Sequence, residues 1–194
     1  MRDREIYTAG PITGLSYAAA RRSWRERIVE LLPPHILTRS PMRGKEALMN
    51  LTSIGGDAET MTSFGLAIAT PKGIVCRDIN DIRSVDALVV NLLGAHCVSI
   101  GTVAEIGAAY ISGKPIILLM EKGDYTINVT DAQFQDIAPK FIVEAGKGTA
   151  DAAWRVTMRR NPHTHAFVTE MAGYWIETLE EAAVLVTHLL TPGV

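Results

Sequence analysis

One apolar stretch decides the class of fold, namely Ala87-Leu88-Val89-Val90-Asn91-Leu92-Leu93. A strand with almost no polar side chains is typical of a parallel sheet whose two faces are both covered by helices. The chain continues into Ser99-Ile100-Gly101-Thr102-Val103-Ala104-Glu105-Ile106-Gly107, which predicts a helix beginning at Thr102 with Glu105 in its first turn. Because ligands of open parallel sheets bind beyond the carboxyl ends of the strands, we expect Glu105 on the functional edge of the sheet.

Short apolar runs alternate with segments of helical periodicity along the chain. The runs that predict strands span residues 6–9, 35–38, 87–93 and 115–120. The segments that predict helices span residues 17–32, 74–84, 102–112, 150–160 and 179–190. A fifth strand is expected either at 141–143 or at 174–176, and the local pattern does not choose between them.

This alternation predicts an α/β protein: a Rossmann-like (flavodoxin-like), doubly wound sheet of five mostly parallel strands with helices on both faces. The length of 194 residues predicts one domain over residues 1–194. Residues from about 40 to 72 form an irregular excursion punctuated by glycine and proline. Long excursions at the carboxyl end of a strand are often functional.

The composition argues against several classes of partner. Lysine and arginine number 19 and aspartate and glutamate 21, so no strong field would draw a nucleic-acid polymer or an anionic membrane. No apolar run approaches the roughly 20 residues that span a bilayer. Cys76 and Cys97 are expected to be small core residues of a cytoplasmic protein. We expect no cofactor and no metal, because His163 and His165 have no acidic ligand near them in the sequence.

The spacing around Glu105 fits two interpretations. Thr102 and Glu105 match a capping box, in which the glutamate only ties down the start of the helix. Alternatively, Glu105 is a reactive carboxylate beside hydroxyls and free amides. The residues Ser99, Gly101 and Thr102 precede it on the same loop, where a phosphate or a hydroxymethyl group could bind.

Three blocks of sequence resemble a known family. The first is Ile6-Tyr7-Thr8-Ala9-Gly10-Pro11-Ile12, and the second is Arg77-Asp78-Ile79-Asn80-Asp81-Ile82 with Ser84–Val90 after it. The third is Ser99–Gly107, continuing through Gly113-Lys114-Pro115. In order and spacing these blocks resemble the nucleoside 2-deoxyribosyltransferases and the related deoxynucleoside 5'-monophosphate N-glycosidases.

The resemblance implies roles for individual residues. Glu105 would be the nucleophile that attacks the anomeric carbon of deoxyribose, Tyr7 would orient its carboxylate, and Asp78 would lie near the leaving base. The residues implied to bind substrate are Ala9, Gly10, Pro11, Asp81, Ser99, Gly101 and Thr102. Asn128 would enter the active site of a neighbouring subunit, so the resemblance also implies a homo-oligomer, a dimer or larger, with shared active sites.

Ser99 bears on the state of the substrate. Family members that act on free nucleosides often carry an aspartate there, whereas the monophosphate hydrolases resembled here carry a serine, which does not repel phosphate. The basic residues Arg39, Arg43 and Lys45 either add phosphate contacts or belong to a solvated loop.

Three functions are therefore compatible with the sequence. The first is transfer of 2-deoxyribose between nucleobases through a covalent glycosyl-Glu105 intermediate. The second is hydrolysis of the N-glycosidic bond of (deoxy)nucleoside 5'-monophosphates. The third is a non-catalytic nucleotide-binding sensor in which Glu105 only caps a helix. The expected partners are a small nucleoside or nucleotide and a free nucleobase.

Overall fold

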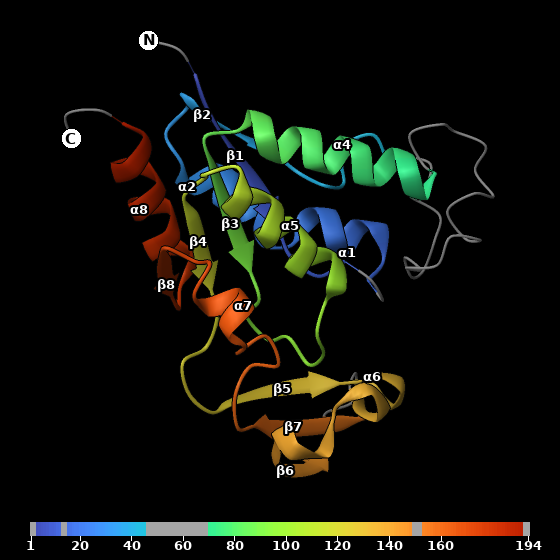
Figure 1. Ribbon diagram of the computed structural model, residues 1–194. Helices are drawn as coiled ribbons and strands as arrows, with labels where there is room; N and C mark the ends of the chain where they lie inside the picture. Colours follow the sequence, from blue (N-terminus) through green and yellow to red (C-terminus); the bar gives the residue numbers. More distant parts are fainter. Residues whose placement is uncertain (1–2, 13–14, 46–69, 149–152, 192–194) are drawn as a thin grey trace.

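A computed structural model describes residues 3–12, 15–45, 70–148 and 153–191. Its main sheet has five strands in the order β2-β1-β3-β4-β8, and every neighbouring pair is parallel (Figure 1). In chain order the strands are β1 (Arg4–Ala9), β2 (Ile36–Arg39), β3 (Ala87–Asn91), β4 (Ile116–Leu119) and β8 (Tyr174–Ile176). This is the flavodoxin-like order, so the predicted fold class is confirmed, with 174–176 as the fifth strand.

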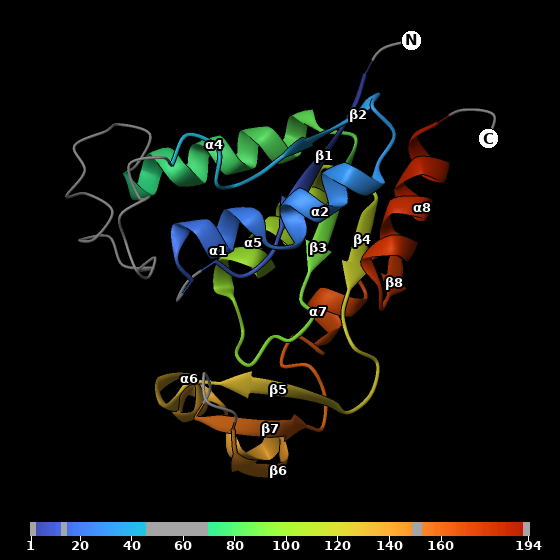
Figure 2. The same ribbon diagram turned by 180° about the vertical axis from the view of Figure 1, so that it is seen from behind.

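Helices cover both faces of this sheet (Figures 1 and 2). On one face lie α2 (Trp24–Leu31) and α8 (Leu179–Leu190), whose apolar side chains pack against Val89 of β3. On the other face lie α4 (Pro71–Ser84), α5 (Ile100–Ile111) and α7 (Ala166–Thr169), which pack against Leu88 and Val90. Because helices exclude water from both faces, the strands are apolar at consecutive positions, as in β3 and β4.

The predicted helix over residues 17–32 is interrupted. It forms α1 (Tyr17–Arg22) and α2, with Ser23 between them at a ψ of −137°. The interruption lies two residues before Arg25, whose side chain is buried at the end of β1. The predicted helix from 74 to 84 begins three residues earlier, where Thr70 caps its N-terminus and Pro71 takes the first helical position.

A second, antiparallel sheet was missed by the sequence analysis. It has the order β5-β7-β6 and consists of β5 (Tyr125–Val129), β7 (Trp154–Met158) and β6 (Ile142–Lys147). The helix α6 (Asp131–Asp136) and the 3-10 helix η3 (Pro139–Phe141) contribute Phe134 and Phe141 to its apolar cluster. The predicted helix over 150–160 is therefore wrong, because Val156 and Met158 are buried at alternate positions of a strand. The alternative fifth strand at 141–143 is also wrong, since most of it lies in β6.

Other expectations have mixed outcomes. Cys76 and Cys97 are exposed, so placing them in the core was wrong. Most of the irregular excursion at about 40–72 falls on residues 46–69, which lie outside the described residues. In the described part of the chain, no helix combines the length and apolarity that crossing a membrane requires.

Candidate active site

Tyr7 and Glu105 meet at the carboxyl edge of the main sheet. Tyr7 is fully buried near the end of β1, and its hydroxyl donates a hydrogen bond to Oε1 of Glu105 at 2.9 Å. Glu105 extends from α5 and keeps part of its surface accessible. The contact joins residues that are 98 positions apart in sequence. The fold thus presents a carboxylate that is oriented by a phenol and remains within reach of a ligand.

The helix that carries Glu105 begins earlier than the sequence predicted. Ser99 is the N-cap of α5, and its Oγ accepts hydrogen bonds from the amide of Thr102 at 3.4 Å and from the hydroxyl of Thr102 at 2.9 Å. Placing the helix start at Thr102 was therefore wrong, and Glu105 lies in the second turn. Since Ser99 supplies the cap, the capping-box interpretation of Glu105 is wrong as well.

The surroundings of Glu105 perturb its acidity. Burial, and then the negative charge of Asp78, raise the pKa of Glu105 from 4.5 to about 7. The hydrogen bond from Tyr7 and the charges of Arg25 and Lys45 act in the opposite direction. Burial and the Glu105 charge also raise the pKa of Tyr7, so the phenol stays protonated as a donor. A carboxyl group that titrates near neutrality in a partly accessible site is a candidate for chemistry.

Asp78 lies on α4 and is held by its neighbour in sequence. Arg77 donates to Oδ1 of Asp78 from Nε at 3.0 Å and from Nη2 at 2.7 Å. The same guanidinium donates to the carbonyls of Pro41 at 2.9 Å and Arg43 at 2.7 Å. Arg77 therefore ties the turn after β2 to the helix that carries Asp78. No role for Arg77 was predicted from the sequence.

The end of β1 is shaped by a glycine and a buried arginine. Gly10 has a φ of +151°, and a Cβ there would stand 2.7 Å from the carbonyl oxygen of Asn91. The Arg25 guanidinium donates to the carbonyls of Gly10 and Ala20 at 3.0 Å each and of Thr8 at 3.3 Å. Burial lowers the pKa of Arg25 to about 10. The sequence analysis missed Arg25, although it precedes Ile28 by three positions, on the face of the helix that is buried.

The other residues of this loop are less enclosed. Ala9 is buried in β1, and Pro11 is half-buried directly after Gly10. Gly101 is exposed at the start of α5, and within the described ranges a Cβ there would meet no atom within 4 Å. The approach to the first turn of α5 is therefore open.

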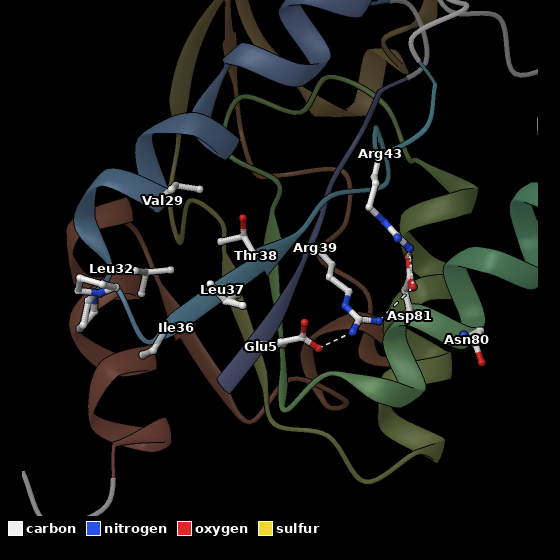
Figure 3. Close-up of a pocket in the computed structure, with 12 residues that line it drawn as sticks. Glu5, Val29, Leu32, Ile36, Leu37, Thr38, Arg39, Arg43, Asn80 and Asp81 are labelled. Atoms are coloured by element: carbon white, nitrogen blue, oxygen red, sulfur yellow. Dashed lines mark hydrogen bonds and ion pairs between the residues drawn. The ribbon is translucent and has the colours of Figure 1, made fainter. Parts of the chain in front are cut away.

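Asp81 lies apart from Tyr7 and Glu105, in a cluster of charges along the edge strand β2. Its buried carboxylate accepts hydrogen bonds from Arg43 at 2.7 and 2.8 Å and from Arg39 at 3.3 Å. Arg39 also pairs with Glu5. These residues line a cavity of about 770 Å³, in which Arg39 and Arg43 point toward Asp81 (Figure 3). Neither Tyr7 nor Glu105 lines this cavity.

A buried polar network holds the loop between β3 and α5. Nε2 of His163 accepts a hydrogen bond from the amide of Ser99 at 2.9 Å, and burial lowers the pKa of His163 to about 4. Asn161 contacts the His163 ring and donates to the carbonyl of Leu92 at 2.7 Å and to Glu121 at 2.9 Å. His163 thus anchors the N-cap of α5. Within the described ranges, no group of three or more His, Cys, Asp or Glu residues is placed to hold a metal.

Asn128 is exposed on β5 in the second sheet, opposite Arg155 of β7. Figure 1 shows this sheet beyond the carboxyl ends of β3 and β4. The hydroxyl of Tyr125 links β5 to the carbonyl of Ala95 in the β3–α5 loop. The entry of Asn128 into a neighbouring subunit's site stays a prediction.

The residues of this site lie within a segment that matches a known protein family. The family described as Nucleoside 2-deoxyribosyltransferase matches residues 6–167, which include Tyr7, Asp78 and Glu105. The chain belongs to the nucleoside 2-deoxyribosyltransferase family. Members of this family are enzymes of nucleoside glycosyl transfer, which bind nucleosides and nucleobases.

One solved structure supports the fold. A structure described as a conserved protein from Enterococcus faecalis V583 is 22% identical, with a TM-score of 0.54 over 96% of this chain and 99% of that one. A 2-desoxiribosyltransferase from Leishmania mexicana is 16% identical, with a TM-score of 0.49 over 97% of this chain and 99% of that one. No curated protein matches the chain.

Proposed function

We propose that this family member moves 2-deoxyribose between nucleobases by a retaining mechanism through a covalent glycosyl-Glu105 intermediate. The observation that carries the proposal is the 2.9 Å hydrogen bond from the buried Tyr7 hydroxyl to a partly accessible Glu105. Because Ser99 caps α5, Glu105 has no structural duty at the helix start. Carboxylates serve as nucleophiles in two-step retaining glycosidases.

In the first step, an oxygen of Glu105 forms a bond to C1' of the sugar while the C1'–N bond to the base breaks. The base leaves with the electron pair of that bond and takes up a proton from solvent, through a water molecule that the Asp78 carboxylate positions. In the second step, a ring nitrogen of the acceptor base attacks C1', loses its proton, and the ester bond breaks to regenerate the Glu105 carboxylate. The Tyr7 hydroxyl orients that carboxylate in both steps.

The base and the 5' end of the sugar are assigned to the loops around Glu105. We assign the residues after β1, Ala9, Gly10 and Pro11, to the pocket of the base. A side chain larger than hydrogen at Gly10 would collide with the carbonyl of Asn91. The 5' end of the sugar is assigned to the first turn of α5, at Ser99, Gly101 and Thr102.

A second candidate function is hydrolysis of (deoxy)nucleoside 5'-monophosphates, with water in place of the acceptor base. The observation that favours it is the uncharged first turn of α5, which has no acidic residue and starts from Ser99. Free amides at a helix N-terminus attract phosphate. The Ser99 hydroxyl accepts from Thr102 and so keeps its own hydrogen available for a phosphate oxygen.

The sensor hypothesis assigned Glu105 to helix capping. The cap is Ser99, so the geometry favours an enzyme over a sensor. We further propose a cytoplasmic homo-oligomer, a dimer or larger, in which Asn128 enters a neighbouring active site. Light scattering of the Asn128→Ala variant and the parent protein, with activity measured in parallel, tests that arrangement: the variant should lose activity and keep its mass.

Product analysis separates the three functions. The protein is incubated with deoxycytidine, deoxyadenosine and their 5'-monophosphates, with and without a second free base, and the products are resolved by chromatography. An exchanged nucleoside indicates transfer, free base with deoxyribose 5-phosphate indicates hydrolysis, and thermal stabilisation without base release indicates a sensor.

Variants locate the nucleophile. Glu105→Gln should abolish turnover, and Glu180→Gln on the exposed surface of α8 serves as the matched control. Intact-mass analysis after rapid quenching should show one deoxyribosyl group on the parent protein and none on Glu105→Gln. Full activity of Glu105→Gln would overturn the mechanism. Ser99→Asp should impair monophosphates more than nucleosides, since a carboxylate repels phosphate.

A further inference from the structure

The loop between β3 and α5, residues 92–99, is held by side chains from outside it. These side chains come from residues 121–125 and 161–163, where the chain enters and leaves the second sheet, and they are Glu121, Tyr125, Asn161 and His163. The backbone groups that they contact are the carbonyls of Leu92 and Ala95 and the amides of Gly94 and Ser99. The loop is thus fixed at four points, and Ser99 is the last of them before α5.

The donors and acceptors around His163 are assigned by the backbone. A backbone amide can only donate, so Nε2 of His163 accepts from Ser99 at 2.9 Å and carries no hydrogen. The ring hydrogen is then on Nδ1, which faces Oδ1 of Asn161 at 3.3 Å. That same oxygen accepts from the His163 amide at 3.0 Å, and the Asn161 side-chain nitrogen donates to Glu121 at 2.9 Å. Each donor along this path from Ser99 to Glu121 meets an acceptor.

Burial makes the Asn161–His163 pair a rigid support. The relative exposures of Asn161 and His163 are 0% and 1%, so a polar group that loses its partner there cannot bind water instead. The turn that follows Ser99 is open by contrast. Ile100 is 83% exposed, and a Cβ on Gly101 would meet no atom of the described residues within 4 Å. A rigid support therefore lies directly before an accessible first turn of α5.

Ser99 connects this support to the substrate. His163 fixes its amide, and its Oγ accepts from the amide and the hydroxyl of Thr102, which directs the Ser99 hydroxyl hydrogen elsewhere. We propose that Asn161 and His163 are positioning residues for the 5' end of the sugar, because they hold Ser99 where its hydroxyl donates to the 5' oxygen. This assignment rests on the proposed function, in which the 5' end binds at the first turn of α5.

The nucleophile is held separately from this support. Tyr7 of β1 donates to Glu105, whereas Asn161 and His163 act on the loop before α5. The 5' oxygen is remote from the C1'–N bond that breaks, so holding it contributes the orientation of C1' against the Glu105 carboxylate. Loss of the His163 acceptor therefore lowers activity only for substrates that carry a 5' oxygen.

Two substrates that differ only at the 5' position test the assignment. They are deoxyadenosine or deoxycytidine, whichever the parent protein turns over faster, and the corresponding 2',5'-dideoxynucleoside. The ratio of their kcat/KM values is the 5' preference. His163→Leu, which offers no acceptor to the Ser99 amide, should lower this preference about 10- to 100-fold. The matched control is His188→Leu at an exposed position of α8, which should keep the preference within about 2-fold of the parent.

Two milder variants support the same test. His163→Gln places a carbonyl oxygen near the position of Nε2, so it should recover most of the 5' preference. Asn161→Ser weakens the contact behind the ring and should lower the preference in the same direction as His163→Leu. Because both residues act through Ser99, the double variant should lose little more than His163→Leu alone. If thermal melts show that His163→Leu does not fold, Asn161→Ser decides in its place.

The outcomes separate this assignment from the proposed function. An equal loss for both substrates would mean that the variants act on Glu105 or on the whole fold, and it would overturn the assignment. No loss for either substrate would overturn it as well. If the parent protein neither exchanges nor releases the base of the deoxynucleoside, the proposed function fails, and the assignment fails with it.

Discussion

Replacing Glu105 by glutamine should make the protein more stable at alkaline pH. The native fold raises the pKa of Glu105 from 4.5 to about 7. The native state therefore binds the Glu105 proton more tightly than the unfolded state does. The parent protein loses this stabilisation as the pH rises from about 4.5 to 7, whereas an uncharged glutamine at the same site loses nothing.

The magnitude follows from the size of the shift. Each pKa unit corresponds to about 1.4 kcal/mol, so the shift from 4.5 to about 7 amounts to at most about 3–4 kcal/mol. Because Glu105 retains some contact with water, we expect a gain of about 1–3 kcal/mol for Glu105→Gln at pH 8. For a chain of this length such a gain raises Tm by roughly 2–12 °C. At pH 4 the two proteins should have nearly equal stability.

Urea unfolding followed by circular dichroism, at intervals from pH 4 to 8, measures the free energy of unfolding of both proteins. The difference between variant and parent isolates Glu105, since every other titrating group contributes to both. Glu180→Gln, on the exposed surface of α8, is the control and should change the free energy of unfolding by less than about 1 kcal/mol. A Glu105→Gln curve parallel to that of the parent protein would refute the reasoning, because it would mean that the fold does not penalise the charged carboxylate.

Four further substitutions test the surroundings of the site. Tyr7→Phe removes a hydrogen bond that lowers the pKa of Glu105, so the acid limb of the pH–rate profile should move up by about one pH unit. Arg25→Met strips donors from three carbonyls and should lower Tm by roughly 6–12 °C in thermal melts. His163→Ala removes the acceptor of an α5 amide, so hydrogen exchange at residues 99–102 should accelerate. Tyr17→Phe deletes an unpartnered hydroxyl, so urea unfolding should show a stability equal to that of the parent or higher by up to about 1 kcal/mol.

The main sheet can be predicted from local composition, because a strand that is buried on both faces has apolar residues at consecutive positions. Runs such as 87–93 and 115–120 are apolar at consecutive positions, which only a doubly covered strand needs. The fifth strand, β8, is not fully buried and has no long apolar run. Residues 141–143 and 174–176 are similar short apolar runs, and pairing of Leu118 with Trp175 across β4 and β8 decides between them.

The second sheet shows where local patterns fail. Residues 154–158 alternate between buried and less buried positions, a period of two that is typical of strands. The segment is only five residues long and follows an alanine-rich stretch, so helical propensity outweighed the alternation in the sequence analysis. Its pairing with β5 and β6 on either side stabilises the strand, and β5 is distant in sequence, with Val129 opposite Trp154.

By itself, the sequence determined the parallel sheet and placed Tyr7, Asp78 and Glu105 in recognisable blocks, and it predicted a site at the carboxyl edge of that sheet. Only the tertiary structure showed that Glu105 does not cap its helix. Ser99 is the N-cap of α5, and the amide of Ser99 is held by His163, which is 64 residues away in sequence. Only the fold also revealed Arg25 and Lys45 as buried cations. The spacing of apolar residues in the sequence indicates which face of a helix or strand is buried. Which groups surround a charged side chain depends on packing between segments that are distant in sequence.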